Sequence, residues 1–155
     1  MELLMKTHGI RISDVVERVV CVTLPEILEE IHQGPLFHWS ILYLEAMGHL
    51  GEDRSMPVFE NQIYNSERGL FILWDDLNLL SKEFYQIIDI TIIGCKDKCA
   101  LRRYKNDQEM YDSCDFVIEM IDSSYWEIFS KNEELIKRLA VKFKKVEIIE
   151  SDYTK

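Results

Sequence analysis

The chain has 155 residues and a formal net charge of −10, with 47% hydrophobic residues, 30% charged residues, six glycines and three prolines. This length and composition predict one globular domain over residues 1–155 and exclude a disordered or fibrous chain. The negative charge argues against direct binding of nucleic acid, which requires cations that neutralise phosphates.

The apolar stretches are too short to span a bilayer, and the N-terminus has no secretory signal. We therefore expect a cytoplasmic protein that does not associate with membranes. In that compartment the four cysteines, Cys21, Cys95, Cys99 and Cys114, are expected to be free thiols. A closed zinc site needs four ligands and only the last three of these cysteines lie near one another, so we expect no metal and no cofactor.

In the first half of the chain the sequence pattern predicts the secondary structure of only some segments. Residues 9–22 contain β-branched pairs that favour strand, but their spacing also fits a helix, and residues 36–50 fit either. Between them, Thr23-Leu-Pro-Glu26 has the pattern of a capping box and predicts a short helix. We expect an irregular connection over residues 52–68.

The middle of the chain predicts a strand, a helix and a second strand. The first strand covers residues 69–74, and Asp75 or Asp76 is expected to cap the helix that follows. Residues 87–94 are apolar except for Asp89, a pattern typical of a strand near the centre of a sheet, covered on both faces. The apolar side of the helix is expected to carry Leu77, Leu80 and Phe84.

The last third predicts a β-hairpin, a helix and a final strand. The hairpin joins residues 115–121 to residues 124–129 through a tight turn. A second capping box, Ser130-Lys-Asn-Glu133, begins an amphipathic helix, and residues 146–149 form the last strand. Because strands and helices mix without strict alternation, the expected fold class is α+β, with a mixed or mainly antiparallel sheet and helices packed on it.

Catalytic motifs are missing from the sequence. It contains no phosphate-binding glycine loop, no nucleophile elbow and no metalloprotease helix, so we do not expect an enzyme. The alternative is a small metal-dependent hydrolase in which Asp75, Asp76 and Asp89 hold a divalent cation. Acidic residues at helix starts are also expected from capping and the helix dipole, which weakens that alternative.

Charge is segregated in the second half of the chain. Residues 95–105 contain five basic residues and one acid, whereas residues 106–134 contain nine acids and one base, interleaved with aromatic residues. Acids that steer a partner and aromatics that anchor it are typical of a surface that binds a basic protein. An equally compatible interpretation is a solvated edge whose aromatic side chains belong to the core. The predicted partner-binding residues are Asp107, Glu109, Tyr111, Asp112, Glu119, Asp122, Tyr125 and Trp126.

The segments 69–78 and 115–131 resemble bacterial immunity proteins, in particular the ribonuclease-toxin immunity proteins of contact-dependent growth inhibition systems. The resemblance covers about residues 69–145 and lies in general sequence character. It implies a protein without enzyme activity that binds a cognate toxin C-terminal domain, a basic nuclease, and blocks its active site. A further alternative is a subunit of another cytoplasmic assembly that docks through the basic side of the helix over residues 131–143.

Overall fold

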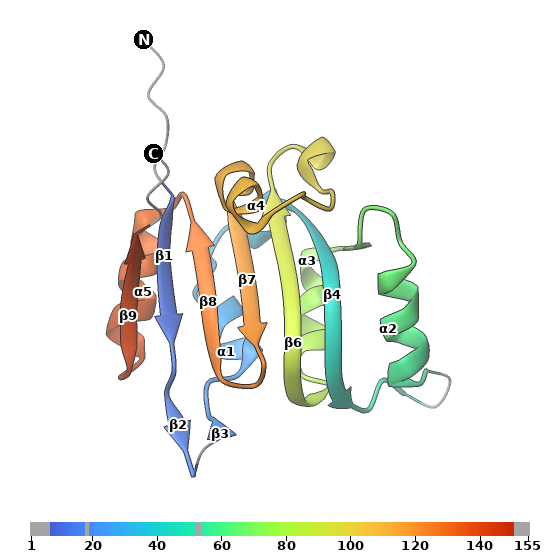
Figure 1. The fold of residues 1–155 in the computed structure, drawn as a ribbon, viewed down its shortest axis with the longest axis horizontal. Helices are drawn as coiled ribbons and strands as arrows, with labels where there is room; N and C mark the ends of the chain where they lie inside the picture. The colour runs from blue at the N-terminus through green and yellow to red at the C-terminus, as the bar shows by residue number, and fades with distance from the viewer. Residues whose placement is uncertain (1–6, 18, 52–53, 151–155) are drawn as a thin grey trace.

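The computed structural model describes residues 7–17, 19–51 and 54–150. Over these residues the chain forms five α-helices and a seven-stranded sheet with the strand order β5-β4-β6-β7-β8-β1-β9 (Figure 1). All neighbouring strands of this sheet are antiparallel, which confirms the predicted α+β fold. None of the helices among the described residues is long and apolar enough to cross a membrane.

The sheet contains β1 (His8–Ile12), β4 (His38–Gly48), β5 (Leu70–Ile72), β6 (Phe84–Cys95), β7 (Phe116–Ile121), β8 (Tyr125–Ser130) and β9 (Val146–Glu150). A separate hairpin pairs β2 (Val15–Val16) with β3 (Val19–Val20). The helices are α1 (Leu24–Leu28), α2 (Met56–Tyr64), α3 (Trp74–Ser81), α4 (Asp107–Ser113) and α5 (Glu133–Lys142), with short 3-10 turns at Gly34–Leu36 and Lys98–Ala100.

The two faces of the sheet are covered unequally. Helices α1, α3 and α5 lie behind the sheet in Figure 1, and their apolar residues form the main core with one face of the strands. Helix α2 lies along the edge beside β4, whereas α4 covers only one end of the opposite face, over β7. A smaller core cluster forms under α4, around Met110, Val117 and Phe129. No other helix of the described residues covers this second face, and we call its uncovered part the open face.

The predicted hairpin in the last third of the chain is confirmed. Strands β7 and β8 pair antiparallel, and the Ser124 N–H donates to the Ile121 carbonyl across the turn. Asp122 and Ser123 have φ angles of 46° and 56°. Positive φ at both central residues defines a type I′ turn, whose twist matches that of the flanking strands. Short polar residues at these two positions tolerate this backbone better than apolar ones.

The structure shows the secondary structure of the two segments for which the sequence pattern fitted both helix and strand. Residues 9–22 form β1 and the β2–β3 hairpin, and residues 36–50 form a 3-10 turn and the long strand β4. The capping box before α1 is present as predicted, because Thr23 Oγ1 accepts from the Glu26 N–H and the Glu26 carboxylate accepts from the Thr23 N–H. The strand predicted at residues 87–94 is β6, which lies next to the central strand β7. The prediction that both of its faces are covered was wrong, because Asp89 and Thr91 are partly exposed on the open face.

Several predicted helix boundaries were wrong. Most of the expected irregular connection over residues 54–68 is helix α2, which Ser55 caps and whose first turn accommodates Pro57, while residues 52 and 53 lie outside the described residues. Helix α3 is preceded by Leu73, so its two aspartates lie in the first turn rather than at the cap, and Phe84 belongs to β6. Helix α5 is capped by Asn132 instead of Ser130.

Candidate functional site

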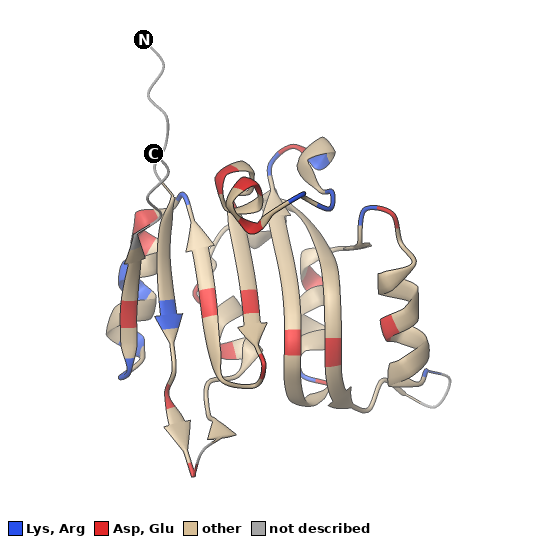
Figure 2. Ribbon diagram, viewed as in Figure 1, with Lys and Arg blue, Asp and Glu red and all other residues tan. Residues whose placement is uncertain are grey.

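A row of paired side chains crosses the open face of the sheet. Neighbouring strands bring together Tyr43, Thr91, Glu119, Glu127, Arg11 and Glu147, each directly opposite the next. Carboxylate positions lie along β4, β6, β7 and β8 in Figure 2, with a basic position beside them on β1. Because β-strand side chains alternate between faces, one register places all of these residues on the side away from α1, α3 and α5.

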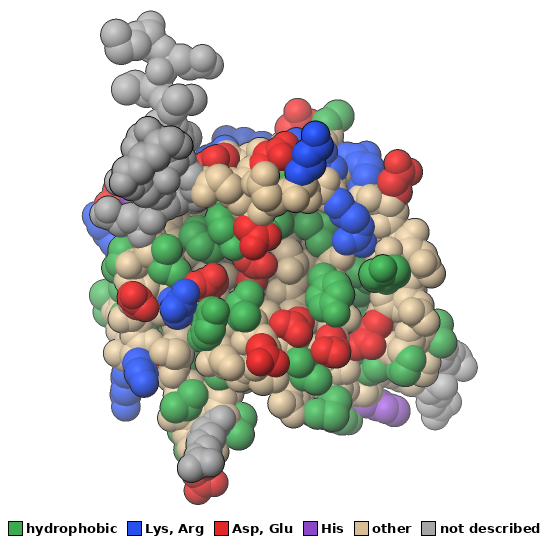
Figure 3. Space-filling model, viewed as in Figure 1, with side chains coloured by type: hydrophobic (Ala, Val, Ile, Leu, Met, Phe, Trp, Pro, Cys, Tyr) green, Lys and Arg blue, Asp and Glu red, His purple; other side chains and the backbone are tan. Residues whose placement is uncertain are grey.

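A second group of carboxylates lies next to this row, towards the turn ends of β4 and β6. Glu45 and Asp89 are directly opposite each other in the β4–β6 pair, and Glu60 reaches this region from α2 to accept the Ala46 N–H at 2.8 Å. Burial raises the pKa of the Tyr43 hydroxyl, and these three carboxylates raise it further. Figure 3 shows the acidic side chains gathered on this part of the molecule.

These carboxylates have no ion-pair partner in the described part of the chain. The ion pairs among the described residues include none that involves Glu45, Glu60 or Asp89. Like charges directly opposite each other on neighbouring strands destabilise a sheet. The molecule therefore maintains an unfavourable arrangement here that a basic ligand would relieve. We use the name acidic face for Glu45, Glu60, Asp89, Glu119, Asp122 and Glu127.

Glu119 is the most buried member of the acidic face, with only 7% of its surface exposed. Its carboxylate accepts a 2.8 Å hydrogen bond from the Tyr111 hydroxyl and a longer one, 3.4 Å, from Thr91. Burial is the main reason that the pKa of Glu119 rises to about 7; the bond from Tyr111 lowers it in part, and Asp107 and Glu127 add to the rise. Glu119 therefore exchanges its proton near neutral pH.

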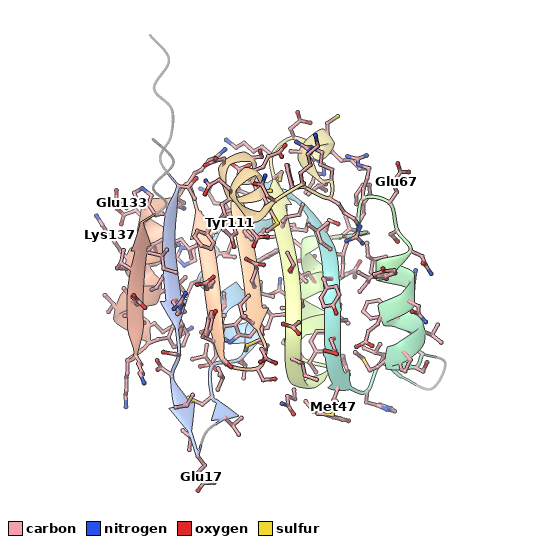
Figure 4. The ribbon with its side chains drawn as sticks, in the orientation of Figure 1. Glu17, Met47, Glu67, Tyr111, Glu133 and Lys137 are labelled. Carbon is pink, nitrogen blue, oxygen red and sulfur yellow. The ribbon has the colours of Figure 1, made fainter. Side chains whose placement is uncertain are left out.

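Tyr111 joins α4 to the sheet above Glu119 (Figure 4). Its ring stacks on Phe129 with the centroids 3.8 Å apart, and its hydroxyl points to Glu119. Burial and the neighbouring carboxylate raise the pKa of the Tyr111 hydroxyl, so this group stays protonated and donates. The contact fixes the helix that carries three of the predicted acidic residues.

Glu127 differs from the rest of the acidic face because it has a strong cationic partner. Arg11 donates to its Oε2 from both Nε and Nη2, at 2.9 and 2.7 Å. The guanidinium also lies 4.4 Å above the centre of the Tyr125 ring. The carboxylate raises the pKa of Arg11, while partial burial opposes this rise. Charge is thus balanced at the β1–β8 side of the open face and unbalanced at the β4–β6 side.

The structure distributes the predicted partner-binding residues over separate regions. Asp107, Glu109 and Asp112 lie on α4, and Asp122 lies in the β7–β8 turn at the opposite end of the strands. Asp122 still belongs to the open face, because its N–H donates to the Asp89 carboxylate. Tyr125 is partly exposed on β8.

Trp126 was wrongly predicted as a surface residue. Only 1% of its surface is exposed, and its indole N–H donates to the Val22 carbonyl at 2.8 Å in the main core. It faces the helices because it follows Tyr125 on the strand, and consecutive strand residues point to opposite faces. The alternative interpretation, in which aromatic residues of the acidic segment belong to the core, holds for this side chain.

The basic segment that precedes the acidic one has a structural role in part. Arg103 donates to the backbone carbonyls of Leu42, Ile63 and Ser66, which ties its loop to β4 and the end of α2. Arg102 pairs with Glu109 at 3.0 Å. The segregation of charge in the sequence thus partly reflects contacts that hold the loop and α4 in place.

The residues proposed for a metal-dependent hydrolase are not brought together. Asp75 and Asp76 lie in the first turn of α3, behind the sheet, whereas Asp89 lies on the open face. Within residues 7–17, 19–51 and 54–150, no group of three or more His, Cys, Asp or Glu side chains is placed to hold a metal ion. Cys95 and Cys114 are both buried and their thiols are hydrogen-bonded to each other, and Cys99 is exposed in a separate turn.

Sequence reasoning missed Glu45 and Glu60, and it considered Asp89 only as a metal ligand. The alternation of exposed Tyr43, Glu45 and Met47 with buried residues was a signal for a strand with one open face. Glu60 gave no comparable signal, because its helix was not predicted and its contact with Ala46 depends on the tertiary fold.

Comparisons with known proteins give a family and no function. A search of curated proteins and a search of solved structures each returned no match. A family model described as "Protein of unknown function (DUF2691)" matches residues 9–155, which is nearly the whole chain. The chain therefore belongs to the DUF2691 family.

Proposed function

We propose that this protein is an immunity protein, which binds a basic nuclease toxin domain in the cytoplasm through its acidic face and blocks the toxin's active site. The observation that carries the proposal is the group of carboxylates formed by Glu45, Glu60 and Asp89, for which the described part of the chain provides no ion pair. A nuclease binds phosphates through basic side chains, so its active cleft is positively charged and complements this negatively charged face.

The geometry of the open face suits a protein partner. Seven strands at about 4.8 Å spacing give a surface roughly 30 Å wide. A stable complex needs about 800 Å² from each partner, which a sheet face of this width can supply. Exposed Tyr43 offers an aromatic ring on which an arginine or lysine of the partner can rest while the carboxylates accept its hydrogen bonds.

Electrostatics also favour rapid capture of such a partner. The net charge of −10 attracts a basic protein from a distance, and long-range attraction raises association rates by about 10- to 1,000-fold at low salt. The resemblance of residues 69–145 to immunity proteins is the reason for proposing a nuclease toxin domain as the partner. An inhibitor that must act before a toxin degrades RNA or DNA gains more from a fast encounter than from affinity alone.

The test uses the product of the reading frame directly upstream of the gene, because toxin and immunity genes are expected to be adjacent. Its C-terminal domain is purified, mixed with this protein and assayed for degradation of RNA and DNA. We expect a stable complex with one toxin domain for each copy of this protein, and loss of nuclease activity. A toxin domain that remains active and elutes separately in the presence of excess protein contradicts the proposal.

A further inference from the structure

The edge of the sheet formed by β5 is unusual in its composition. The sheet has two edge strands, β5 and β9. Strand β9 includes Glu147 and follows Lys144 and Lys145, and such charges protect an edge against pairing with another chain. Strand β5 consists of Leu70, Phe71 and Ile72 and is followed by Leu73, without a charged residue. The strand therefore has no charged residue of its own, and the nearby cations Arg68 and Lys98 lie over the Phe71 ring, 5.0 and 5.2 Å from its centre.

The side chains at the β5 edge are strongly exposed for their type. Phe71 is 41% exposed, Leu73 is 75% exposed, and Leu79 on the adjacent helix α3 is 62% exposed. Single exposed apolar residues are common on protein surfaces, but several that lie together indicate an interaction surface. We call Phe71, Leu73 and Leu79 the edge patch.

Two hollows lie on either side of the edge patch. The larger has a volume of about 700 Å³ and is lined by apolar residues of α2, β5 and α3, among them Phe59, Ile72 and Leu80. The smaller has a volume of about 350 Å³ and is lined by Trp39 and Trp74. Phe71, Ile72 and Leu73 border both hollows. Protruding leucines thus lie beside hollows whose walls are partly apolar, as required when one surface packs against a copy of itself.

The charges around the edge patch are of both signs, unlike those of the acidic face. Arg54, Asp76 and Glu83 line the larger hollow, and Lys98 and Asp75 line the smaller one. The ion pairs among the described residues use none of these five side chains. A rim with unpaired charges of both signs complements a second copy of itself. The acidic face, by contrast, repels a second copy.

We propose that the edge patch is the interface of a homodimer, in which Leu73 and Leu79 of each copy pack into the larger hollow of the other across a two-fold axis. In such an isologous contact the same residues serve both copies, so the basic side chains of one rim meet the acidic side chains of the other. This proposal does not depend on the partner proposed for the acidic face.

The test is the mass of the full chain in sedimentation velocity, from low micromolar to submillimolar concentration. We expect a dimer for the natural sequence and a monomer for the double variant Leu73→Glu, Leu79→Glu, whose dimer dissociation constant should rise roughly tenfold or more. The matched control is Val16→Glu, Val141→Glu, because these valines are 61% and 87% exposed and lie outside the edge patch. The control should remain dimeric.

Circular dichroism distinguishes loss of the dimer from loss of the fold, since all four substituted side chains are exposed and should leave the spectrum unchanged. A natural sequence that is monomeric over the whole range overturns the proposal. A folded Leu73→Glu, Leu79→Glu variant that still sediments as a dimer overturns it as well. Neither result bears on the binding of a toxin domain by the acidic face.

Discussion

Replacing Glu119 with glutamine should stabilise the protein at alkaline pH. The pKa of this carboxyl is 4.5 before folding and about 7 in the folded protein. At about 1.4 kcal/mol for each pKa unit, keeping the buried group ionised costs the folded state about 3 kcal/mol above pH 7. Glutamine has nearly the same shape and still accepts the hydrogen bond from Tyr111, but it has no charge to bury.

The stabilisation by Glu119→Gln should appear only as pH rises. Below pH 4.5 the carboxyl is protonated in both the folded and the unfolded state, so its full contribution to stability is present there. As pH rises from 4.5 to above 7, the unfolded state loses the proton first and the folded state loses this contribution. Glu119→Gln should therefore match the natural protein at low pH and exceed it by up to about 3 kcal/mol at pH 8.5.

The assay is urea unfolding at several pH values between 4 and 9, with the free energy of unfolding compared at each. Glu45→Gln is the matched control, because Glu45 is an exposed member of the acidic face and its substitution should shift stability by less than about 1 kcal/mol at every pH. Parallel pH profiles for Glu119→Gln and the natural protein would refute the reasoning, as would a variant that is less stable at pH 8.5.

Four further substitutions test separate contacts. Trp126→Ala should lower the free energy of unfolding by about 3–5 kcal/mol, measured by urea unfolding, because it leaves a large cavity and an unpaired Val22 carbonyl. Arg103→Ala should cost about 2 kcal/mol in the same assay, whereas Arg102→Ala, which removes an exposed ion pair and a contact with the Tyr104 ring, should cost less. Tyr111→Phe should raise the pKa of Glu119, seen by NMR titration, and destabilise the fold above pH 7, because it removes a hydrogen bond to the ionised carboxylate.

Elements governed by local chemistry could be predicted from the sequence. The β7–β8 hairpin depends on two turn residues between β-branched and aromatic runs, and α1 depends on a four-residue capping box. Helix α2 was missed although Ser55 and Pro57 are ordinary residues for a cap and a first turn. Its short apolar pattern, with Phe59 and Ile63 as the buried residues, is hard to distinguish from that of a loop until the sheet edge is known.

The candidate site was less predictable because it depends on strand register. The acidic face collects residues from α2 and four strands, separated by up to 82 positions in sequence between Glu45 and Glu127. Irregularities in the β4–β6 pairing decide which residues face outwards there. The acidic segment over residues 106–134 was expected to form one continuous surface. The fold divides it, because Trp126 points inwards and Glu119 lies beneath α4.

The most direct test of the proposed function compares two variants that change the net charge equally. Glu45→Gln, Glu60→Gln, Asp89→Asn removes three charges of the acidic face and keeps the hydrogen-bond acceptors. Glu17→Gln, Glu133→Gln, Glu134→Gln removes three charges at the tip of the β2–β3 hairpin and on α5, and Figure 4 marks Glu17 and Glu133 at the periphery. The measurement is the association rate with the toxin domain encoded upstream, at low and high salt. We predict a rate about 10- to 100-fold lower for the acidic-face variant at low salt, and a nearly unchanged rate for the peripheral variant. Equal rates for the two variants would contradict the account.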